Sequence, residues 1–191
     1  MLNAKGFSLS ELMIAQVLAL LLMLAAMQLY MTLLRHDMQW LARVQLVQTT
    51  ESVLAMIEQD IRSAGYRNGA AASSERVFYA TAVCLITGRD SDHNGVISGP
   101  QEWRGYKYDA RHQQLLVQGW ERVANPAYSC EQGGGWQPLL ADGMRVHAAS
   151  WTPVANSAQR LWHLNLALAA SQVAGPVVSL EKHVVRRNEQ S

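Results

Sequence analysis

The sequence has only two cysteines, no C-x-x-C pair and no surplus of charge of either sign. Lys and Arg number 16 against 15 Asp and Glu, so no electrostatic excess favours binding to nucleic acid. The six histidines are scattered, and a pair of histidines at zinc-ligand spacing is not found beside the cysteines. These absences disfavour a nucleic-acid-binding protein and a zinc site built on the cysteines.

Catalytic motifs are missing as well. No Ser or Cys lies in a recognisable nucleophile elbow, and Gly133-Gly134-Gly135 matches neither a phosphate loop nor a dinucleotide-binding fingerprint. Tryptophans could form a platform for a glycan or a peptide, but aromatic residues in strands are more often part of a core. The sequence therefore predicts a protein that is not an enzyme and has no small-molecule substrate.

Charge is absent from one long stretch, Leu12 to Leu34. At about 1.5 Å per residue these 23 residues form a helix of about 35 Å, which is long enough to span a hydrocarbon core of about 30 Å. A Sec signal peptide would be cut after such a run, behind small residues, whereas here Gly6-Phe7 and a single acid, Glu11, precede it. We expect the helix to remain on the mature protein and to cross a membrane.

The segment from Lys5 to Glu11, Lys-Gly-Phe-Ser-Leu-Ser-Glu, resembles the class III leader of type IV prepilins and type II secretion pseudopilins. The resemblance implies that residues 1–6 are a leader, that a prepilin peptidase cuts between Gly6 and Phe7, and that the new N-terminus at Phe7 is methylated. It also implies that Glu11 pairs with the Phe7 amine of a neighbouring subunit.

Glu11 has a physical argument of its own. An unpaired acid in a membrane-like core costs about 2.5 to 3.5 kcal/mol or more, so a water-excluding bundle of helices would require a cationic partner for it. The alternative is an interfacial acid that the positive end of the helix dipole stabilises.

The helical pattern continues beyond the membrane span. Apolar residues recur at spacings of three, four or seven, with polar residues on the other faces, and Gly65 provides a helix stop. We predict a membrane half of the helix over 7–34 and an amphipathic half over 35–65 whose apolar face covers another apolar surface. The stripe consists of Leu34, Met38, Leu41, Val44, Val47, Leu54, Ile57, Ile61 and Ala64.

The segment from Asp60 to Tyr66 reads Asp-Ile-Arg-Ser-Ala-Gly-Tyr. It resembles the D-[IL]-R-x-A-G-[YF] signature that closes the N-terminal helix in minor pilins of the PilW and PpdB type. The similarity extends along the chain, through a cysteine before an acidic loop, a second cysteine in a glycine-rich region and a strand-rich end. It implies a type IV minor pilin of the PpdB (PilW-like) group, related to the J-type type II secretion pseudopilins.

From Arg76 onward the pattern is extended, and about six strands are expected. The fold class is therefore predicted to be α+β, with the long N-terminal helix packed on an antiparallel sheet in a head over 66–191. The resemblance implies that this fold is pilin-like. The expected strands are 77–87, 103–108, 115–120, 144–151, 161–168 and 177–185.

Two further features of the head carry predictions. On the non-cytoplasmic side of a membrane, Cys84 and Cys130 are most simply a disulfide, the alternatives being two buried thiols or half of a metal site. Between them, oxygen-bearing side chains at relative positions one, three and five, with Gly95 at six, form the front half of an EF-hand-type calcium loop. The candidate Ca²⁺ ligands are Asp90, Asp92, Asn94, Val96 through its carbonyl, Gln101 and Glu102.

The back half of this loop departs from the EF-hand pattern. Position twelve is Gln101 instead of the bidentate Glu, and Glu102 comes one residue late. Two interpretations stay open, a loop stabilised by Ca²⁺ and a solvated turn of Asp, Asn and Gly. No cofactor is required by either.

Taken together, the sequence and the resemblance predict a minor pilin that joins other minor pilins and the major pilin to prime or cap a type IV pilus. It would be processed by prepilin peptidase, cross the bacterial inner membrane once with its head in the periplasm, and then enter the filament or its tip. One alternative is a minor pseudopilin of a type II secretion system. An alternative of another class is a tip-exposed, calcium-stabilised adhesion or recognition module.

Overall fold

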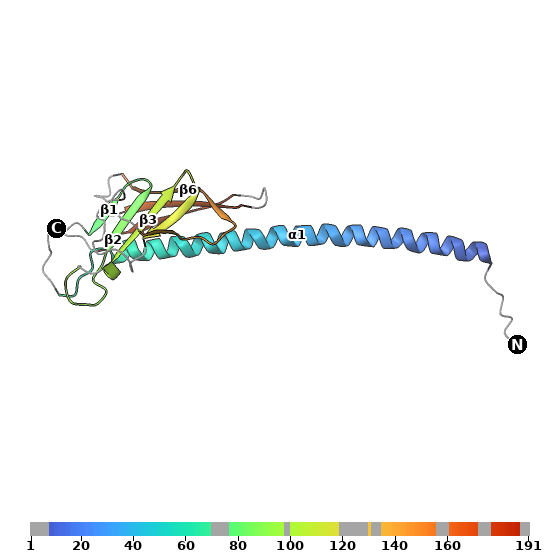
Figure 1. Ribbon diagram of the computed structural model, residues 1–191, viewed down its shortest axis with the longest axis horizontal. Helices are drawn as coiled ribbons and strands as arrows, with labels where there is room; N and C mark the ends of the chain where they lie inside the picture. The colour runs from blue at the N-terminus through green and yellow to red at the C-terminus, as the bar shows by residue number, and fades with distance from the viewer. Residues whose placement is uncertain are drawn as a thin grey trace. The chain divides into compact units, whose positions relative to one another are not determined.

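The computed structural model describes residues 8–69, 77–97, 100–118, 130, 135–155, 161–171 and 177–187. The chain divides into two compact units, Met1–Ala42 and Arg43–Ser191. The helix α1 (Leu9–Ser63) contributes to both units, and every described strand belongs to the second (Figure 1). The predicted α+β class, a long N-terminal helix and a head of antiparallel sheets, is confirmed.

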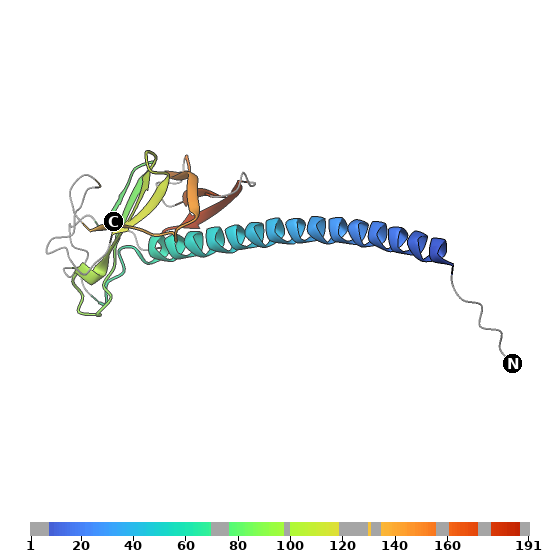
Figure 2. The same ribbon diagram turned by 45° about the vertical axis from the view of Figure 1, so that its right-hand side comes forward.

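Eight described strands form two antiparallel sheets (Figure 2). The five-stranded sheet has the order β1-β2-β3-β4-β5 and consists of β1 (Phe78–Ala80), β2 (Cys84–Gly88), β3 (Trp103–Asp109), β4 (Gln114–Gln118) and β5 (Trp136–Pro138). The three-stranded sheet has the order β6-β7-β8 and consists of β6 (Met144–Pro153), β7 (Leu161–Ala170) and β8 (Val178–Val185). A short 3₁₀ helix, η1 (Pro100–Glu102), precedes β3.

The prediction of a single strand over 77–87 is wrong, because this segment is a hairpin of β1 and β2. Thr81 and Cys84 close the turn: the Thr81 N–H donates to the Cys84 carbonyl at 2.7 Å, and the Cys84 N–H donates to Thr81 Oγ1 at 3.1 Å. The two residues between them, Ala82 and Val83, carry none of the Gly, Asn or Asp signals of a tight hairpin turn. The strand β5 was not predicted either.

The part of α1 in the second unit buries one face. Leu54, Ile57 and Ile61 have no exposed surface, and they pack in a single core with residues from both sheets. Full burial of each such side chain stabilises the fold by about 1.5 to 3 kcal/mol. The amphipathic pattern is thus confirmed for this part of the helix. Three earlier positions of the predicted stripe lie in the first unit and are exposed: Leu34, Met38 and Leu41.

The helix ends at a glycine, as the sequence predicts. Gly65 has a φ of 80°, a left-handed conformation that residues with a Cβ disfavour. Its N–H donates to the carbonyl of Gly88 at 2.8 Å, and the Tyr66 N–H donates to the carbonyl of Ser63 at 3.0 Å. The chain therefore leaves α1 directly beside the end of β2.

A charged side chain of α1 lies in the core. Asp60 is 4% exposed, and its Oδ2 accepts a hydrogen bond of 2.6 Å from the hydroxyl of Tyr106, which is fully buried on β3. Arg104 Nη1 lies 3.8 Å from the same oxygen. Burial, followed by the charge of Asp60, raises the pKa of Tyr106, so the tyrosine is the donor at any physiological pH. Asp60 thereby joins α1 to the five-stranded sheet.

Replacing Tyr106 by Phe should lower the free energy of unfolding by about 1.5 to 3 kcal/mol, because a buried carboxylate loses a hydrogen bond. Urea unfolding of the full chain in detergent, followed by tryptophan fluorescence, measures the change. The matched control is Tyr108→Phe on the same strand. Within the described residues, the Tyr108 hydroxyl makes longer bonds, of 3.2 and 3.4 Å, to the carbonyls of His147 and Val146, so the loss should be smaller. Equal losses in the two variants would contradict this role of the Asp60–Tyr106 bond.

Candidate functional site

The first part of α1 is apolar and exposed. Among the described residues, α1 is the one helix long and apolar enough to cross a membrane, and none of its most apolar stretch is buried within the chain. The predicted span from Leu12 to Leu34 lies in this part. A helix that is apolar on all sides requires lipid or other apolar helices around it.

Glu11 caps its own helix. The Ser8 N–H donates to Glu11 Oε2 at 3.0 Å, and the Ser8 carbonyl accepts from the Leu12 N–H at 3.2 Å. A Ser-x-x-Glu capping box has two hydrogen bonds, and this is the one from the backbone N–H of the serine to the side chain of the glutamate. The Ser-x-x-Glu pattern is present in the sequence, but the capping role of Glu11 was not predicted. A carboxylate accepts several hydrogen bonds, so the cap is compatible with a cationic partner from another subunit. Gly6 and Phe7, the predicted cleavage and methylation residues, lie outside the described residues.

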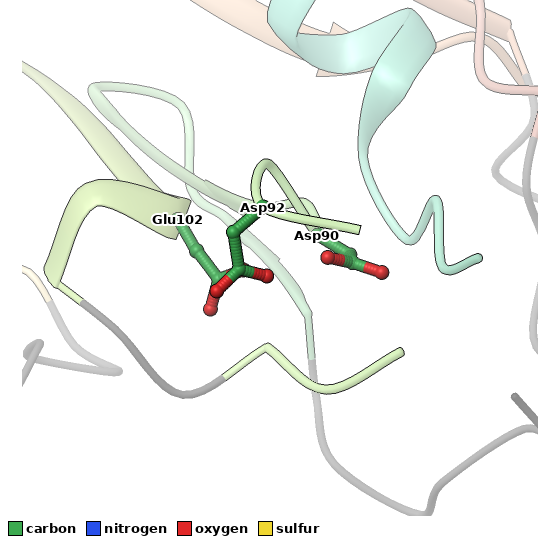
Figure 3. A group of neighbouring side chains, drawn as sticks. All are labelled: Asp90, Asp92 and Glu102. Carbon is green, nitrogen blue, oxygen red and sulfur yellow. The ribbon is translucent and has the colours of Figure 1, made fainter. Parts of the chain in front are cut away.

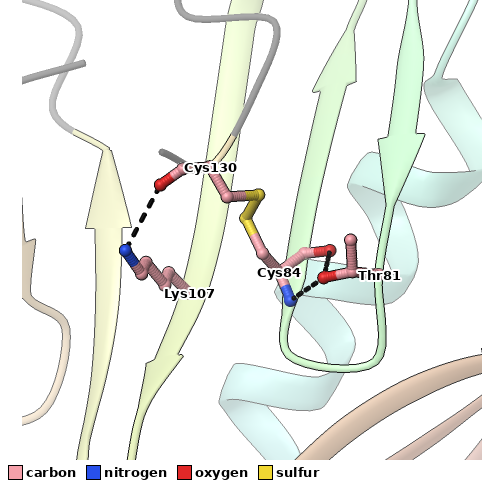
Figure 4. Close-up of a disulfide and its surroundings, with 4 residues drawn as sticks. All are labelled: Thr81, Cys84, Lys107 and Cys130. Carbon is pink, nitrogen blue, oxygen red and sulfur yellow. Dashed lines mark hydrogen bonds between the residues drawn. A yellow bond between two sulfur atoms is a disulfide. The ribbon is translucent and has the colours of Figure 1, made fainter. Parts of the chain in front are cut away.

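The two cysteines form the predicted disulfide. Cys84 begins β2 and is buried, and its Cα lies 6.2 Å from that of Cys130 (Figure 4). Lys107 on β3 donates to the carbonyl of Cys130 at 3.2 Å, and its ammonium lies 5.9 Å from the centre of the Trp136 ring. The bridge and Lys107 together hold the backbone at Cys130 beside the five-stranded sheet.

Removing the bridge with the double variant Cys84→Ala and Cys130→Ala should lower the free energy of unfolding. For a sequence separation of 46 residues the chain-entropy model gives about 4 kcal/mol. Urea unfolding measures the loss, and wild-type protein with a reductant should unfold like the variant. Alkylation of both cysteines in native, unreduced protein would contradict the bridge.

Three carboxylates converge in the loop between β2 and β3. Asp90, Asp92 and Glu102 each present an oxygen, and these oxygens lie within 4.8 Å of one another (Figure 3). Asp90 and Glu102 are 2% and 4% exposed, whereas Asp92 is exposed. Like charges at this distance repel one another in the absence of a cation.

Backbone N–H groups hold Asp90 in place. Its Oδ2 accepts from the Gly95 N–H at 2.8 Å and from the Asn68 N–H at 3.0 Å, and its Oδ1 accepts from the Asn94 N–H at 3.1 Å. The bond from Asn68 lowers the pKa of Asp90, with burial acting in the opposite direction. The carboxyl group is therefore ionised throughout the neutral range. Gly95 adopts a φ of 86°, which lets the loop turn back toward the carboxylate.

The structure brings together three of the predicted calcium ligands. The 3₁₀ helix η1 buries Glu102 beside the aspartates and leaves Gln101 exposed. Glu102, one residue later than the EF-hand pattern requires, therefore takes the place of the last ligand of the loop. The amide of Asn94 is engaged locally, since its Nδ2 donates to Asp92 at 2.7 Å and its Oδ1 accepts from the Val96 N–H at 2.7 Å. The converging donors are oxygens, which suit a hard cation such as Ca²⁺.

The end of α1 supports this loop. The Asp90 N–H donates to the carbonyl of Tyr66 at 2.9 Å, and the Tyr66 ring meets the ring of His93 edge-on with centroids 6.1 Å apart. The residues of the predicted signature thus have structural roles: Asp60 binds Tyr106 in the core, and Gly65 and Tyr66 position the loop. Tyr106 was not predicted, since nothing in its local sequence marks a buried partner for an acid 46 residues away.

A long helix with an apolar first part, followed by a head of antiparallel sheets, is the layout of a pilin-like protein. A family model described as prepilin peptidase-dependent protein B (PpdB) matches residues 39–187, and the chain belongs to this family. No curated relative and no solved structure matches the chain. The matched region begins after Glu11 and the apolar run, so the family assignment is independent of the leader residues.

Proposed function

We propose that this protein is a minor pilin that joins other minor pilins to prime or cap the assembly of a type IV pilus. In this proposal a prepilin peptidase removes residues 1–6 and methylates Phe7. The observation that carries the proposal is the apolar first part of α1, which nothing in the described chain buries, on a chain of the PpdB family. Lipid covers this surface before assembly, and the helices of neighbouring subunits cover it in the filament.

Glu11 selects the position of the subunit in such a bundle. Neighbouring helices exclude water, so the carboxylate requires a cation, and the amine of Phe7 on the adjacent subunit supplies one. The bond from Ser8 keeps the carboxylate at the start of the helix, where the positive end of the dipole also stabilises it.

The same proposal places the head in the periplasm, with the inner membrane around the first part of α1. The disulfide between Cys84 and Cys130 supports this side of the membrane, because disulfides persist in oxidising compartments. The partners are other minor pilins, the major pilin and the peptidase, and the role is structural and without catalysis.

The assembly proposal predicts that Glu11→Gln is cleaved and inserted normally but enters filaments about tenfold less, a change equivalent to about 1.4 kcal/mol. The physical reason is that the partner amine stays unpaired in an apolar bundle. The variant is expressed in cells that lack the wild-type gene. Mass spectrometry of the N-terminus reports cleavage and methylation at Phe7, and immunoblots compare sheared filaments with membranes. The matched control is Glu51→Gln, an exposed acid farther along α1.

The number of filaments on these cells separates the alternatives. Cells without the gene should have few filaments, and Glu51→Gln should restore them whereas Glu11→Gln should not. Normal filament numbers with loss of protein export would favour a type II secretion pseudopilin. Normal numbers with loss of surface contact would favour a tip adhesion module.

We also propose that Ca²⁺ binds the acidic loop. The spacing of Asp90, Asp92 and Asn94 resembles the front of an EF-hand, and the carboxylates of Asp90, Asp92 and Glu102 converge within 4.8 Å. A divalent cation would relieve their mutual repulsion and link the end of α1 to the start of β3. In this proposal calcium stabilises the head and is not a required cofactor.

Calcium should raise the melting temperature of the full chain, because a ligand that binds only the folded state stabilises it. Asp92→Asn should abolish this shift at equal calcium concentration, since it removes one charge from an exposed position without disturbing the core. The control is Asp109→Asn, the last residue of β3, whose carboxylate bonds His112 instead of the loop. Native mass spectra with and without chelator report the bound ion. No bound calcium at about 1 mM, in the range of weak extracellular sites, would contradict the proposal.

A further inference from the structure

Two histidines and a glutamate share one face of the three-stranded sheet. The register of β7 and β8 places His163 opposite His183, and Asn165 opposite Glu181. Because alternate residues of a strand project to the same side, these four side chains lie on one face. The opposite face carries residues that are buried in the core, including Trp162 and Leu164.

The side chains on this face are close together. The ring centroids of His163 and His183 are 5.0 Å apart. Nε2 of His163 lies 3.3 Å from Oε2 of Glu181, and Asn165 donates to Oε1 of the same carboxylate at 3.0 Å. The His163 side chain is 29% exposed and that of Glu181 is 59% exposed, so the cluster is open to ions from solution.

These distances match those of ligands around a metal ion. A charge-assisted N–H···O bond measures about 2.7 to 2.9 Å, so the contact of 3.3 Å between His163 and Glu181 is long for one. Two ligand atoms held at about 2.0 to 2.2 Å by one tetrahedral Zn²⁺ are about 3.4 Å apart, and two imidazole rings on the same ion have centres about 5 Å apart. The contact between His163 and Glu181 and the distance between the two ring centres agree with these values. Unlike the carboxylates of the acidic loop, the three ligand atoms do not all lie within 4.8 Å of one another, so His183 has to turn toward the other two to complete the site.

We propose that His163, His183 and Glu181 bind a transition-metal ion, with Zn²⁺ as the preferred ion. Imidazole and carboxylate donors suit Zn²⁺, whereas Ca²⁺ takes oxygens, so this site differs in chemistry from the acidic loop. His183 is exposed, and rotation about its side-chain bonds brings a nitrogen to the ion without movement of the backbone. Asn165 orients Glu181, as partners of metal ligands generally do. Three protein ligands leave the fourth position to water.

The bound ion would join β7 to β8, which is an edge strand of its sheet. On the other side of β8, Lys182 is bound to Glu58 of α1 at 3.0 Å. The metal would therefore add a second restraint to this strand, on the face that points away from the helix. The inference rests on the register of the sheet and is independent of the proposed role in a pilus.

The test is a zinc titration of the full chain in detergent against a chromophoric chelator, with excess Ca²⁺ present. One Zn²⁺ per chain is expected. His183→Gln should weaken zinc binding at least about tenfold, because the loss of a residue that only hydrogen-bonds a metal ligand already weakens metal binding by that factor. The control is His147→Gln, an exposed histidine of β6, which should bind as the wild type does. Circular dichroism verifies that both variants are folded.

A second measurement records the visible absorption spectrum with Co²⁺ in place of Zn²⁺. Visible absorption bands of a tetrahedral ion should be present in the wild type and in His147→Gln and be lost in His183→Gln. Equal zinc affinity in the wild type and His183→Gln would overturn the proposal. So would no binding at about 1 mM Zn²⁺, a concentration that corresponds to a binding free energy of only about 4 kcal/mol. Displacement of the zinc by Ca²⁺ would also overturn it, because the ion would then lie in the acidic loop.

Discussion

The second unit depends on the burial of one face of α1 against both sheets. Leu54, Ile57 and Ile61 form this face, and their burial supplies a large part of the hydrophobic stabilisation of the core. Asp60 lies among them, so a carboxylate is buried in the core and requires a hydrogen-bond donor there. The hydroxyl of Tyr106 donates a short hydrogen bond to it, and this bond fixes the position of β3 against the helix.

The end of α1 decides where the acidic loop lies. Gly65 turns the chain, and the carbonyl of Tyr66 then accepts a hydrogen bond from Asp90. The two proposed ion sites of the head are therefore supported differently. The acidic loop is held by backbone N–H groups near the end of a helix, whereas the histidine site is held by the register of two strands. The oxygen donors of the acidic loop suit Ca²⁺, whereas the imidazoles of the histidine site suit Zn²⁺.

The first part of α1 has no apolar partner within the described chain, so its packing is completed by lipid or by other subunits. Its start is defined by the bond between Ser8 and Glu11, which places a carboxylate at the beginning of an apolar helix. The family match covers residues 39–187 and includes neither Glu11 nor the apolar run, so the helix and the family match point to a pilin-like protein independently. Their agreement on a pilin-like protein is the strongest support for the proposed role in assembly.

Local pattern in the sequence was sufficient for the long helix, its end at Gly65, the α+β class and the disulfide, because spacing, a glycine stop and an even pair of cysteines are local or compositional signals. The hairpin at Ala82-Val83 was missed because its turn relies on Thr81 instead of a glycine. The closing role of Glu102 and the partner of Asp60 came only from the tertiary structure. The pair of His163 and His183 came from it too, because strand register brings together residues 20 positions apart that no motif connects.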